Sequence, residues 1–213
     1  MNIWHVCSAI VTAYLLGSIP AAIWYGEAYF GIDVRKHGSG NAGATNTFRV
    51  LGKRAGTIVL LIDVLKGWTA TMLANILFFL DAIESSQILP FKLILGFIAV
   101  VGHLYPVFAR FKGGKGVATS LGMILATDPQ VASVCIAIFV LVLLASHYVS
   151  LSSIVAAFAF PMLLLLGVFG KSSTVLIIFG FFLFVVVVIT HKKNIVKLLN
   201  GKENRIYLWG QQK

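Results

Sequence analysis

The sequence predicts an all-α integral membrane protein that crosses the bilayer seven times. Its 213 residues are 59% hydrophobic and only 11% charged, whereas soluble domains are typically about 45–50% apolar. The hydrophobic residues form long runs, and the charged residues cluster between them. The distribution of Lys and Arg along the chain then sets the expected orientation of the runs.

Six runs are long enough, or nearly so, to cross the hydrocarbon core, which takes about 20 helical residues. These runs are residues 3–25, 56–80, 90–109, 130–149, 151–169 and 173–190. The first is interrupted at Gly17-Ser18-Ile19-Pro20. It has no basic segment before it and is too long for a signal peptide, so we expect it to be retained as a span.

A seventh run, Gly116–Thr127, would be about 18 Å long as a helix. The positive-inside rule places Lys- and Arg-rich segments in the cytosol. Such segments are residues 35–54, 110–115 and 192–213, whereas residues 81–89 and 128–129 carry no basic residue. All three basic segments reach the cytosol only if Val117–Thr127 also crosses. We therefore expect seven helices, a periplasmic N-terminus, a cytosolic C-terminus and a short fourth helix that starts within the headgroup zone.

We expect one membrane domain over residues 1–213, because no internal repeat or low-complexity linker is present. The net charge of +10 does not predict a nucleic-acid partner, because basic residues gather in the cytosolic loops of membrane proteins for topological reasons alone. Cys7 and Cys135 lie within apolar runs, which predicts neither a disulfide framework nor a metal site.

A glycine- and lysine-rich stretch, FKGGKGVAT at residues 111–119, precedes the short fourth helix. Glycines allow backbone N–H groups to approach a ligand, and a helix start favours an anion. We expect the amides of Gly113–Gly116 and the charge of Lys115 to bind an anion. A Walker A loop is excluded, because Gly116 stands where Ser or Thr is required. The alternative is a basic loop that only fixes topology.

A second polar stretch, HGSGNAGATNTFR at residues 37–49, lies in the first cytosolic loop. It offers N–H donors, hydroxyls, amides and the guanidinium of Arg49, which suit a phosphate or a carboxylate. The alternative is a flexible surface turn.

Two further polar stretches are expected on the cytosolic side. His191 and Asn194 share one face of a predicted amphipathic interfacial helix, which could also be a basic anchor for anionic headgroups. Ser150–Ser153 would ordinarily be helix caps, but their location with the other polar stretches favours one shared site. Asp63 and Lys66 lie at i and i+3 within a span, and we expect them to hold helices together.

Several common catalytic motifs are absent. The sequence has no His-x4-Asp dyad, no G-x-S-x-G elbow and no cytosolic carboxylate cluster for Mg²⁺. A site with many anion-binding groups and no evident nucleophile or strong base suits a substrate that is already activated. We expect no metal or cofactor.

These stretches together resemble the bacterial acyl-phosphate:glycerol-3-phosphate acyltransferase family, often called PlsY. The similar segments are residues 17–20, 38–49, 63–67, 102–108, 112–119 and 191–203. They follow the same order along nearly the whole chain. Ala42 stands where the family often has Pro, and Lys197 where Arg is usual.

The resemblance implies a seven-helix enzyme of the bacterial inner membrane with a cytosolic active site. It would transfer an acyl group from acyl phosphate to the 1-hydroxyl of glycerol 3-phosphate, giving lysophosphatidic acid and phosphate. This reaction is the first committed step of phospholipid biosynthesis. The implied partners are these two substrates, membrane lipids and functional coupling to the enzyme that produces acyl phosphate.

Roles for particular residues follow from the same resemblance. The implied catalytic residues are Ser39, Arg49, Lys115, Ser152, Ser153, His191 and Asn194. The implied substrate-binding residues are Gly40, Asn41, Asn46, Gly113, Gly114, Gly116, Thr119 and Glu203.

Three other classes remain open from the residues alone. An organophosphate transporter should show inverted repeats and broken helices near the midplane. A structural membrane protein would not need such a concentration of glycines and amides. A phosphotransferase acting on lipid carriers should show acidic metal ligands.

Overall fold

The computed structural model describes residues 2–206 and divides into two compact units, Met1–Thr127 and Asp128–Lys213. The regular elements within residues 2–206 are nine α-helices and three 3₁₀ helices, which confirms the all-α prediction for the described part of the chain. Lys213, one of the basic residues of the C-terminal segment, lies outside the described residues.

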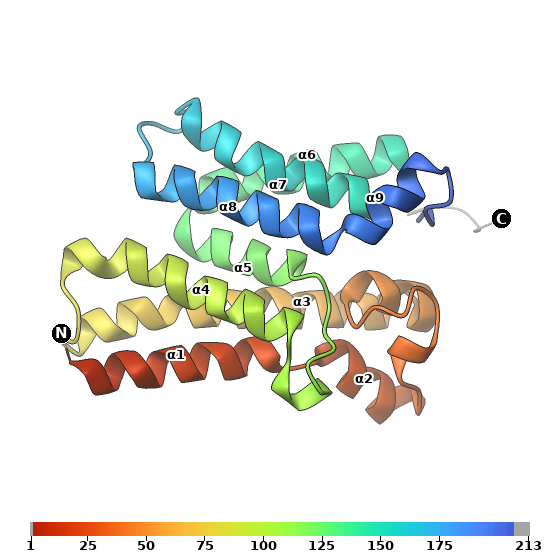
Figure 1. The fold of residues 1–213 in the computed structure, drawn as a ribbon, viewed down its shortest axis with the longest axis horizontal. Helices are drawn as coiled ribbons and strands as arrows, with labels where there is room; N and C mark the ends of the chain where they lie inside the picture. The colour runs from red at the N-terminus through yellow and green to blue at the C-terminus, as the bar shows by residue number, and fades with distance from the viewer. Residues whose placement is uncertain (1, 207–213) are drawn as a thin grey trace. The chain divides into compact units, whose positions relative to one another are not determined.

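Unit 1 is built around one long helix. Its elements are α1 (Ile3–Ser18), α2 (Ala21–Phe30), η1 (Val34–Lys36), α3 (Ala44–Phe79), η2 (Ser85–Gln87), α4 (Ile88–Leu104), η3 (Val107–Ala109) and α5 (Val117–Thr127). Helix α3 packs against α1, α4 and α5, and α1 also packs against α4 (Figure 1). A Cβ at Gly67 would fall on the carbonyl of Thr119. Small residues thus bring these helices into backbone contact, as in transmembrane bundles.

Two helix breaks refine the expected spans of unit 1. The first span breaks at Ile19-Pro20, where α1 and α2 meet at 44°, because proline lacks the N–H that would continue the helix. Helix α3 begins at Ala44, well before the expected start at Gly56, and Gly52 interrupts it with φ 85° and ψ 179°. A non-glycine residue rarely adopts that conformation. Residues 44–51 therefore form a separate helical segment that carries Asn46 and Arg49.

Unit 2 contains four helices. They are α6 (Pro129–Ser146), α7 (Val149–Leu165), α8 (Thr174–Thr190) and α9 (Lys192–Leu199). Helix α7 packs against α6 and α8 (Figure 1). The chain turns by 64° between α8 and α9. Helix α9 exposes Lys192, Lys193 and Lys197 while Asn194 and Ile195 are half-buried, which confirms the amphipathic helix expected after His191.

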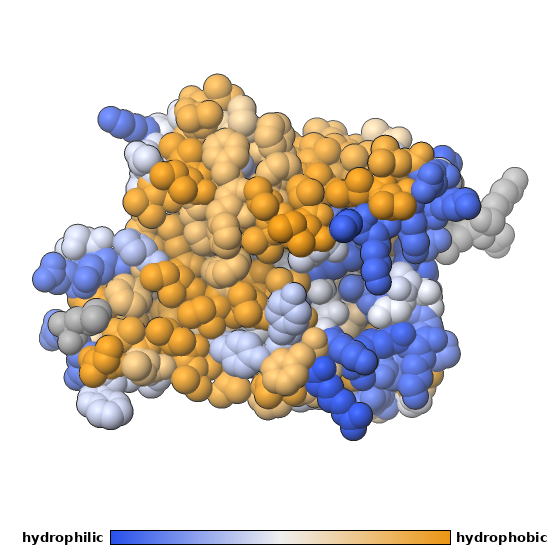
Figure 2. Space-filling model, in the orientation of Figure 1, coloured by the Kyte–Doolittle hydropathy of each residue, from blue (hydrophilic) through white to orange (hydrophobic). Residues whose placement is uncertain are grey.

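By length and composition, three helical segments of the described residues are able to cross a membrane: Ala44–Phe79, Ser85–Ala109 and Pro129–Ser146. The number rises to five if the bent pairs α1–α2 and α8–α9 each form one span. Helices α5 and α7 are apolar but shorter. In Figure 2, hydrophobic residues cover the visible sides of α1, α4 and α8, and hydrophilic residues gather around α2 and around α9.

Candidate active site

The first polar loop is organised by a single buried amide. Asn46, at the start of α3, is 1% exposed. Its Oδ1 accepts hydrogen bonds from the backbone N of Ser39 (2.8 Å) and from Ser39 Oγ (3.1 Å). Its Nδ2 donates to the carbonyls of Val34 (2.8 Å) and His37 (3.1 Å). We expected Asn46 to contact substrate; instead its amide is fully used inside the loop, where it positions Ser39.

Glycines permit the fold of this loop. Gly38 and Gly40 have φ values of 59° and 73°, a region that favours glycine. A Cβ at Gly38 would also collide with the Oδ1 of Asn46. Ser39 and Gly40 are exposed, and Asn41 and Arg49 are half-buried. The loop therefore presents Ser39 at its surface on a backbone that Asn46 holds from below.

Arg35, which pairs with Asp33, links the segment before this loop to η3 by a hydrogen bond. The Nε and Nη2 atoms of Arg35 donate to the carboxylate of Asp33 at 2.8–3.1 Å, and Nη1 donates to the carbonyl of Ala109 at 3.2 Å. The Arg35 guanidinium holds the pKa of Asp33 below its usual value, mainly through these side-chain hydrogen bonds. This hydrogen bond directly joins two polar segments of unit 1, residues 33–46 and the segment after α4.

In the second glycine stretch, two backbone amides bond to the end of α4 and not to the anion that we expected. The backbone N of Gly113 donates to the carbonyl of Leu104 and that of Gly114 to the carbonyl of His103, both at 3.2 Å. These carbonyls are at the C-terminal end of α4, where a helix leaves acceptors unsatisfied. The prediction that the Gly113 and Gly114 amides bind an anion is therefore corrected: they cap α4. Glycine is required here for close packing, because a Cβ at Gly114 would fall on the Nε2 of His103.

The residues that follow lead into α5. Lys115 is half-buried, and Gly116 has φ 81°, a left-handed conformation that turns the chain into the helix. Thr119 is fully buried, and its Oγ1 has no hydrogen-bond partner among residues 2–206. The substrate contact expected of Thr119 stays a prediction; in this structure its side chain is buried at the start of α5.

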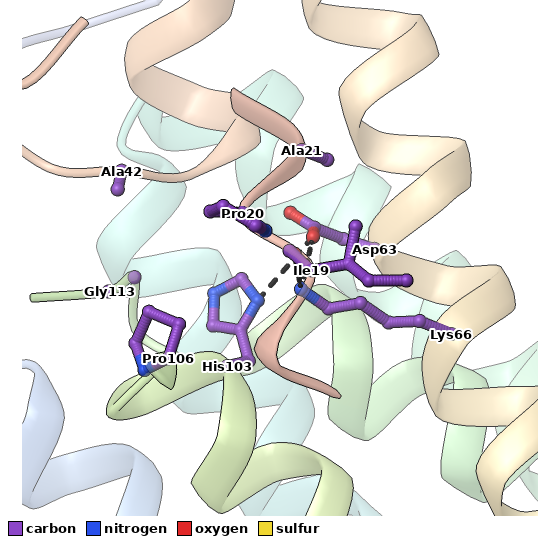
Figure 3. Close-up of a pocket in the computed structure, with 10 residues that line it drawn as sticks. Ile19, Pro20, Ala21, Ala42, Asp63, Lys66, His103, Pro106 and Gly113 are labelled. Carbon is purple, nitrogen blue, oxygen red and sulfur yellow. Dashed lines mark hydrogen bonds and ion pairs between the residues drawn. The ribbon is translucent and has the colours of Figure 1, made fainter. Parts of the chain in front are cut away.

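A small pocket of unit 1 lies beside these two loops (Figure 3). It encloses about 190 Å³ including its open mouth, and its lining comes from five parts of the unit: Ile19, Pro20, Ala21, Ala42, Asp63, Lys66, His103, Pro106, Gly113 and Gly114. Lys66 Nζ lies 2.8 Å from Asp63 Oδ1, and His103 Nδ1 lies 3.4 Å from the same oxygen. The Asp63–Lys66 pair lies within α3, and the contact of Asp63 with His103 links α3 to α4. This agrees with the expectation that these residues hold helices together.

In unit 2, His191 lies at the junction of α8 and α9 and is 3% exposed. Its Nδ1 is 2.8 Å from the carbonyl of Val187. Because a carbonyl only accepts, Nδ1 carries the proton, and a neutral ring then has its lone pair on Nε2. The structure thus fixes the ring orientation and the tautomer of His191.

A carboxylate joins α9 to the start of α7. Glu203 Oε1 accepts from Asn194 Nδ2 at 2.7 Å and from Ser150 Oγ at 3.2 Å. Arg205 Nε donates to the hydroxyl of Tyr148 at 3.0 Å. Asn194 and Glu203 were both expected at the site, and Ser150 belongs to the Ser150–Ser153 stretch that was expected there. Tyr148 was not among the expected site residues, because its hydroxyl group gave no distinguishing signal in the sequence.

Ser152 and Ser153 are buried near the N-terminal end of α7. Each hydroxyl donates to a carbonyl one turn earlier, Ser152 to Tyr148 at 2.9 Å and Ser153 to Val149 at 2.8 Å. Such bonds satisfy helical carbonyls. In this arrangement the two hydroxyls do not donate to an anion, so the catalytic role implied for Ser152 and Ser153 would require a rotation about the Cβ–Oγ bond if they are to donate to a substrate.

No three His, Cys, Asp or Glu side chains within residues 2–206 are grouped so that they could hold a metal ion. Each unit also carries polar and basic side chains that suit an anion. In unit 1 they gather on the first loop and after α4, and in unit 2 they gather at the α8–α9 junction and the start of α7.

Comparisons with known proteins agree with one another. A family model described as glycerol-3-phosphate acyltransferase matches residues 7–201. A relative of that name from Salinibacter ruber is 45% identical and covers 95% of this chain and 93% of its own. A relative of that name from Listeria welshimeri is also 45% identical, over 91% of this chain and 93% of its own.

Solved structures give the same result. The chain is similar to the glycerol 3-phosphate form of PlsY (YgiH), an integral membrane glycerol 3-phosphate acyltransferase, with 38% identity, a TM-score of 0.80, and coverage of 95% of this chain and 96% of that one. The lysophosphatidic acid form of PlsY (YgiH) is 36% identical with a TM-score of 0.78, and the match covers 95% of each chain. The protein is therefore an all-helical, multi-pass integral membrane protein that belongs to the glycerol-3-phosphate acyltransferase family.

Proposed function

We propose that this protein transfers a fatty acyl group from acyl phosphate to the 1-hydroxyl of sn-glycerol 3-phosphate. The products are 1-acyl-sn-glycerol 3-phosphate and inorganic phosphate, and the reaction commits glycerol 3-phosphate to phospholipid synthesis. The observation that carries this proposal is the family match over residues 7–201, together with the likeness to enzyme structures in glycerol 3-phosphate and lysophosphatidic acid forms. Acyl phosphate is the donor that the resemblance to the acyl-phosphate:glycerol-3-phosphate acyltransferase family implies, and a site without an evident nucleophile suits such an activated donor.

The proposed topology has seven spans, with the N-terminus in the periplasm and the C-terminus in the cytosol of a bacterial inner membrane. Up to five spans of the described residues are long and apolar enough to cross a membrane. The shorter apolar helices α5 and α7 would be the other two spans of this proposal. Helix α5 is short, with 11 residues, or about 16 Å. The basic clusters support this orientation through the positive-inside rule.

The donor phosphate is assigned to Lys115. Its ammonium group would neutralise charge on acyl phosphate and stabilise the negative charge that develops as the anhydride bond breaks. Gly113, Gly114 and Gly116 contribute by close backbone packing, since the first two amides are used by α4. The acyl chain would remain in the bilayer, where the exposed apolar side chains of the helices face lipid.

Binding of glycerol 3-phosphate is assigned to Ser39, Asn41 and Arg49. A guanidinium pairs with a phosphate through two parallel hydrogen bonds, and Ser39 is held at the loop surface by Asn46. Separate roles in the same reaction are assigned to two residues of unit 2. His191 would orient substrate through Nε2, and Asn194 would do so through its side-chain amide. Glu203 holds that amide in place.

The chemical step needs no protein nucleophile. The O1 oxygen of glycerol 3-phosphate attacks the carbonyl carbon of the donor and forms the new ester C–O bond. The C–O bond to phosphate breaks, its electron pair leaves with the phosphate, and the hydroxyl proton ends on the departing phosphate. Correct placement of the two substrates would supply much of the rate.

A direct test supplies purified protein in lipid nanodiscs with palmitoyl phosphate and labelled glycerol 3-phosphate. We expect lysophosphatidate without any coenzyme A or acyl carrier protein, and a loss of about 100-fold or more for Lys115→Met and Arg49→Met. Lys171→Met changes an exposed lysine of the α7–α8 connection and should leave turnover unchanged. Full activity of the Lys115 and Arg49 variants would refute the assigned roles, and absence of product would refute the reaction.

A further inference from the structure

The buried ionisable group of unit 1, Asp63, Lys66 and His103, is assigned no step in the reaction described above. Asp63, Lys66 and His103 are only 2%, 5% and 6% exposed. Asp63 Oδ1 is shared between Lys66 Nζ and His103 Nδ1, at 2.8 Å and 3.4 Å. Lys66 Nζ also donates to the carbonyl of Ile19 at 2.8 Å. These contacts connect α3, α4 and the break between α1 and α2.

Such a group is costly if it serves stability alone. Charges removed from water lose solvation that their attraction repays only in part, and apolar residues of similar size are often as stabilising. Within a membrane span the cost is larger, and such residues are usually tied to function. Unit 1 already packs its helices through small residues, as at Gly67 against Thr119. The charges therefore call for a role beyond joining helices.

The group lies directly against the glycine stretch that precedes Lys115. The backbone N of Gly114 donates to the carbonyl of His103, and the Gly114 Cα is so close to the imidazole that a Cβ would fall on Nε2. Figure 3 shows the ring of His103 between Asp63 on one side and Pro106 and Gly113 on the other. The ring thus lies directly against this backbone, and on its other side His103 Nδ1 is 3.4 Å from the Asp63 carboxylate.

The same group also faces the first polar loop. Ala42, from that loop, lines the pocket together with Asp63, Lys66, His103 and Gly114. On the other side of the break, Lys66 holds the Ile19 carbonyl next to Pro20. A shift of His103 or Asp63 would therefore change the distance between the two loops that carry Ser39 and Lys115.

We propose that Asp63, Lys66 and His103 are positioning residues that hold the Gly113–Gly114 backbone, and through it Lys115, in register with the first polar loop. The inference rests on the proposed function, because Lys115 is the group that it positions. His103 acts on the loop by contact, Asp63 fixes the His103 ring, and Lys66 fixes Asp63 and the Ile19 carbonyl. In this role none of the three needs to touch a substrate.

A double-mutant cycle tests this role. His103→Ala should lower kcat/KM for acyl phosphate by about 100-fold, the scale expected for a displacement of about 1 Å at a catalytic group. The KM for glycerol 3-phosphate should change much less. In a Lys115→Ala background, His103→Ala should reduce the remaining activity by no more than about threefold, because coupled residues are not additive. Asp63→Asn should show the same coupling to Lys115→Ala.

Lys92→Met is the matched control. Lys92 lies at the other end of α4 and donates to the carbonyl of Ala126 at 3.0 Å. Its loss should lower thermal stability without coupling to Lys115. If the His103 and Lys115 effects multiply independently, or if His103→Ala affects both substrates equally, the positioning role is wrong. An inactive wild-type protein would instead refute the proposed function.

Amide hydrogen exchange provides a readout that does not depend on activity. Where His103→Ala yields no folded protein, His103→Gln and Asp63→Asn replace it. Exchange at Gly113 and Gly114 should accelerate by about tenfold or more in these variants, and it should be unchanged in Lys92→Met. Wild-type exchange at Gly113 and Gly114 in folded Asp63→Asn and His103→Gln proteins would overturn the inference.

Discussion

Replacement of Asn46 should disable the first polar loop without disrupting the helices. Asn46→Ala removes four hydrogen bonds, two from Ser39 and two to the carbonyls of Val34 and His37. At about 0.5–1.5 kcal/mol net for each bond, and with water replacing some of them in this exposed loop, the loss is about 2–3 kcal/mol. If the loss appears in the transition state, kcat/KM for glycerol 3-phosphate falls by about 30- to 150-fold.

The side chain chemistry sharpens this test. Asn46→Asp keeps an acceptor for Ser39 but loses both donations and places a carboxylate against two carbonyl oxygens, so it should be at least as damaging as Asn46→Ala. Asn75→Ala is the control, because Asn75 is on the same helix and makes only a 3.5 Å contact with the sulfur of Met72. The assay varies glycerol 3-phosphate at saturating acyl phosphate in nanodiscs. Activity of both Asn46 variants within threefold of wild type would refute the reasoning.

Three further predictions follow from particular contacts. Glu203→Ala removes the acceptor shared by Asn194 and Ser150 and should lower turnover by about tenfold or more. Glu203→Gln keeps an acceptor oxygen and should lose less turnover. Equal losses of turnover in the two variants would argue against this hydrogen-bonding role. The pKa of Asp33 is lowered from 3.8 by Arg35, so the ion pair stabilises the fold fully above pH 3.8 and is lost as pH falls through the lower folded-state pKa. The melting temperatures of wild type and Asp33→Asn should therefore differ by a constant amount at neutral pH and converge only in strong acid; convergence already near pH 6 would contradict this. Gly52→Ala forces φ 85° on a residue with a Cβ and should lower the free energy of unfolding by about 1–3 kcal/mol. The measurement is the melting temperature in detergent, which should fall. An unchanged melting temperature would show that the break in α3 relaxes freely.

Much of the helical framework followed from the sequence because it depends on local properties. Apolar runs predicted the main helices, Pro20 predicted the break after α1, and the spacing of His191, Asn194 and Ile195 predicted the amphipathic α9. The early start of α3 was missed. Residues 44–51 are half polar and do not form an apolar run. Their connection to the apolar part of α3 depends on the positive φ of Gly52, a conformation that glycine permits but does not require.

Contacts between distant residues were the part that sequence patterns did not reveal. The Gly113 and Gly114 amides looked like an anion site because their local sequence suits one, yet the end of α4 folds back to use them. Asn46 looked like a ligand contact and proved to hold the loop. Likewise, Asp63 and Lys66 were visible as a pair at i and i+3, but their contacts with His103 and Ile19 arise only from helix packing.

The central claim is that the glycerol 3-phosphate hydroxyl attacks the carbonyl carbon of an acyl phosphate. Purified protein supplied with palmitoyl phosphate and glycerol 3-phosphate carrying ¹⁸O in its 1-hydroxyl tests this directly by mass spectrometry. We predict lysophosphatidate with ¹⁸O in the ester and one unlabelled phosphate for each ester formed. Free palmitate with a glycerol bisphosphate would show attack at phosphorus instead, and lysophosphatidate formed only with acyl-coenzyme A would contradict the proposed donor.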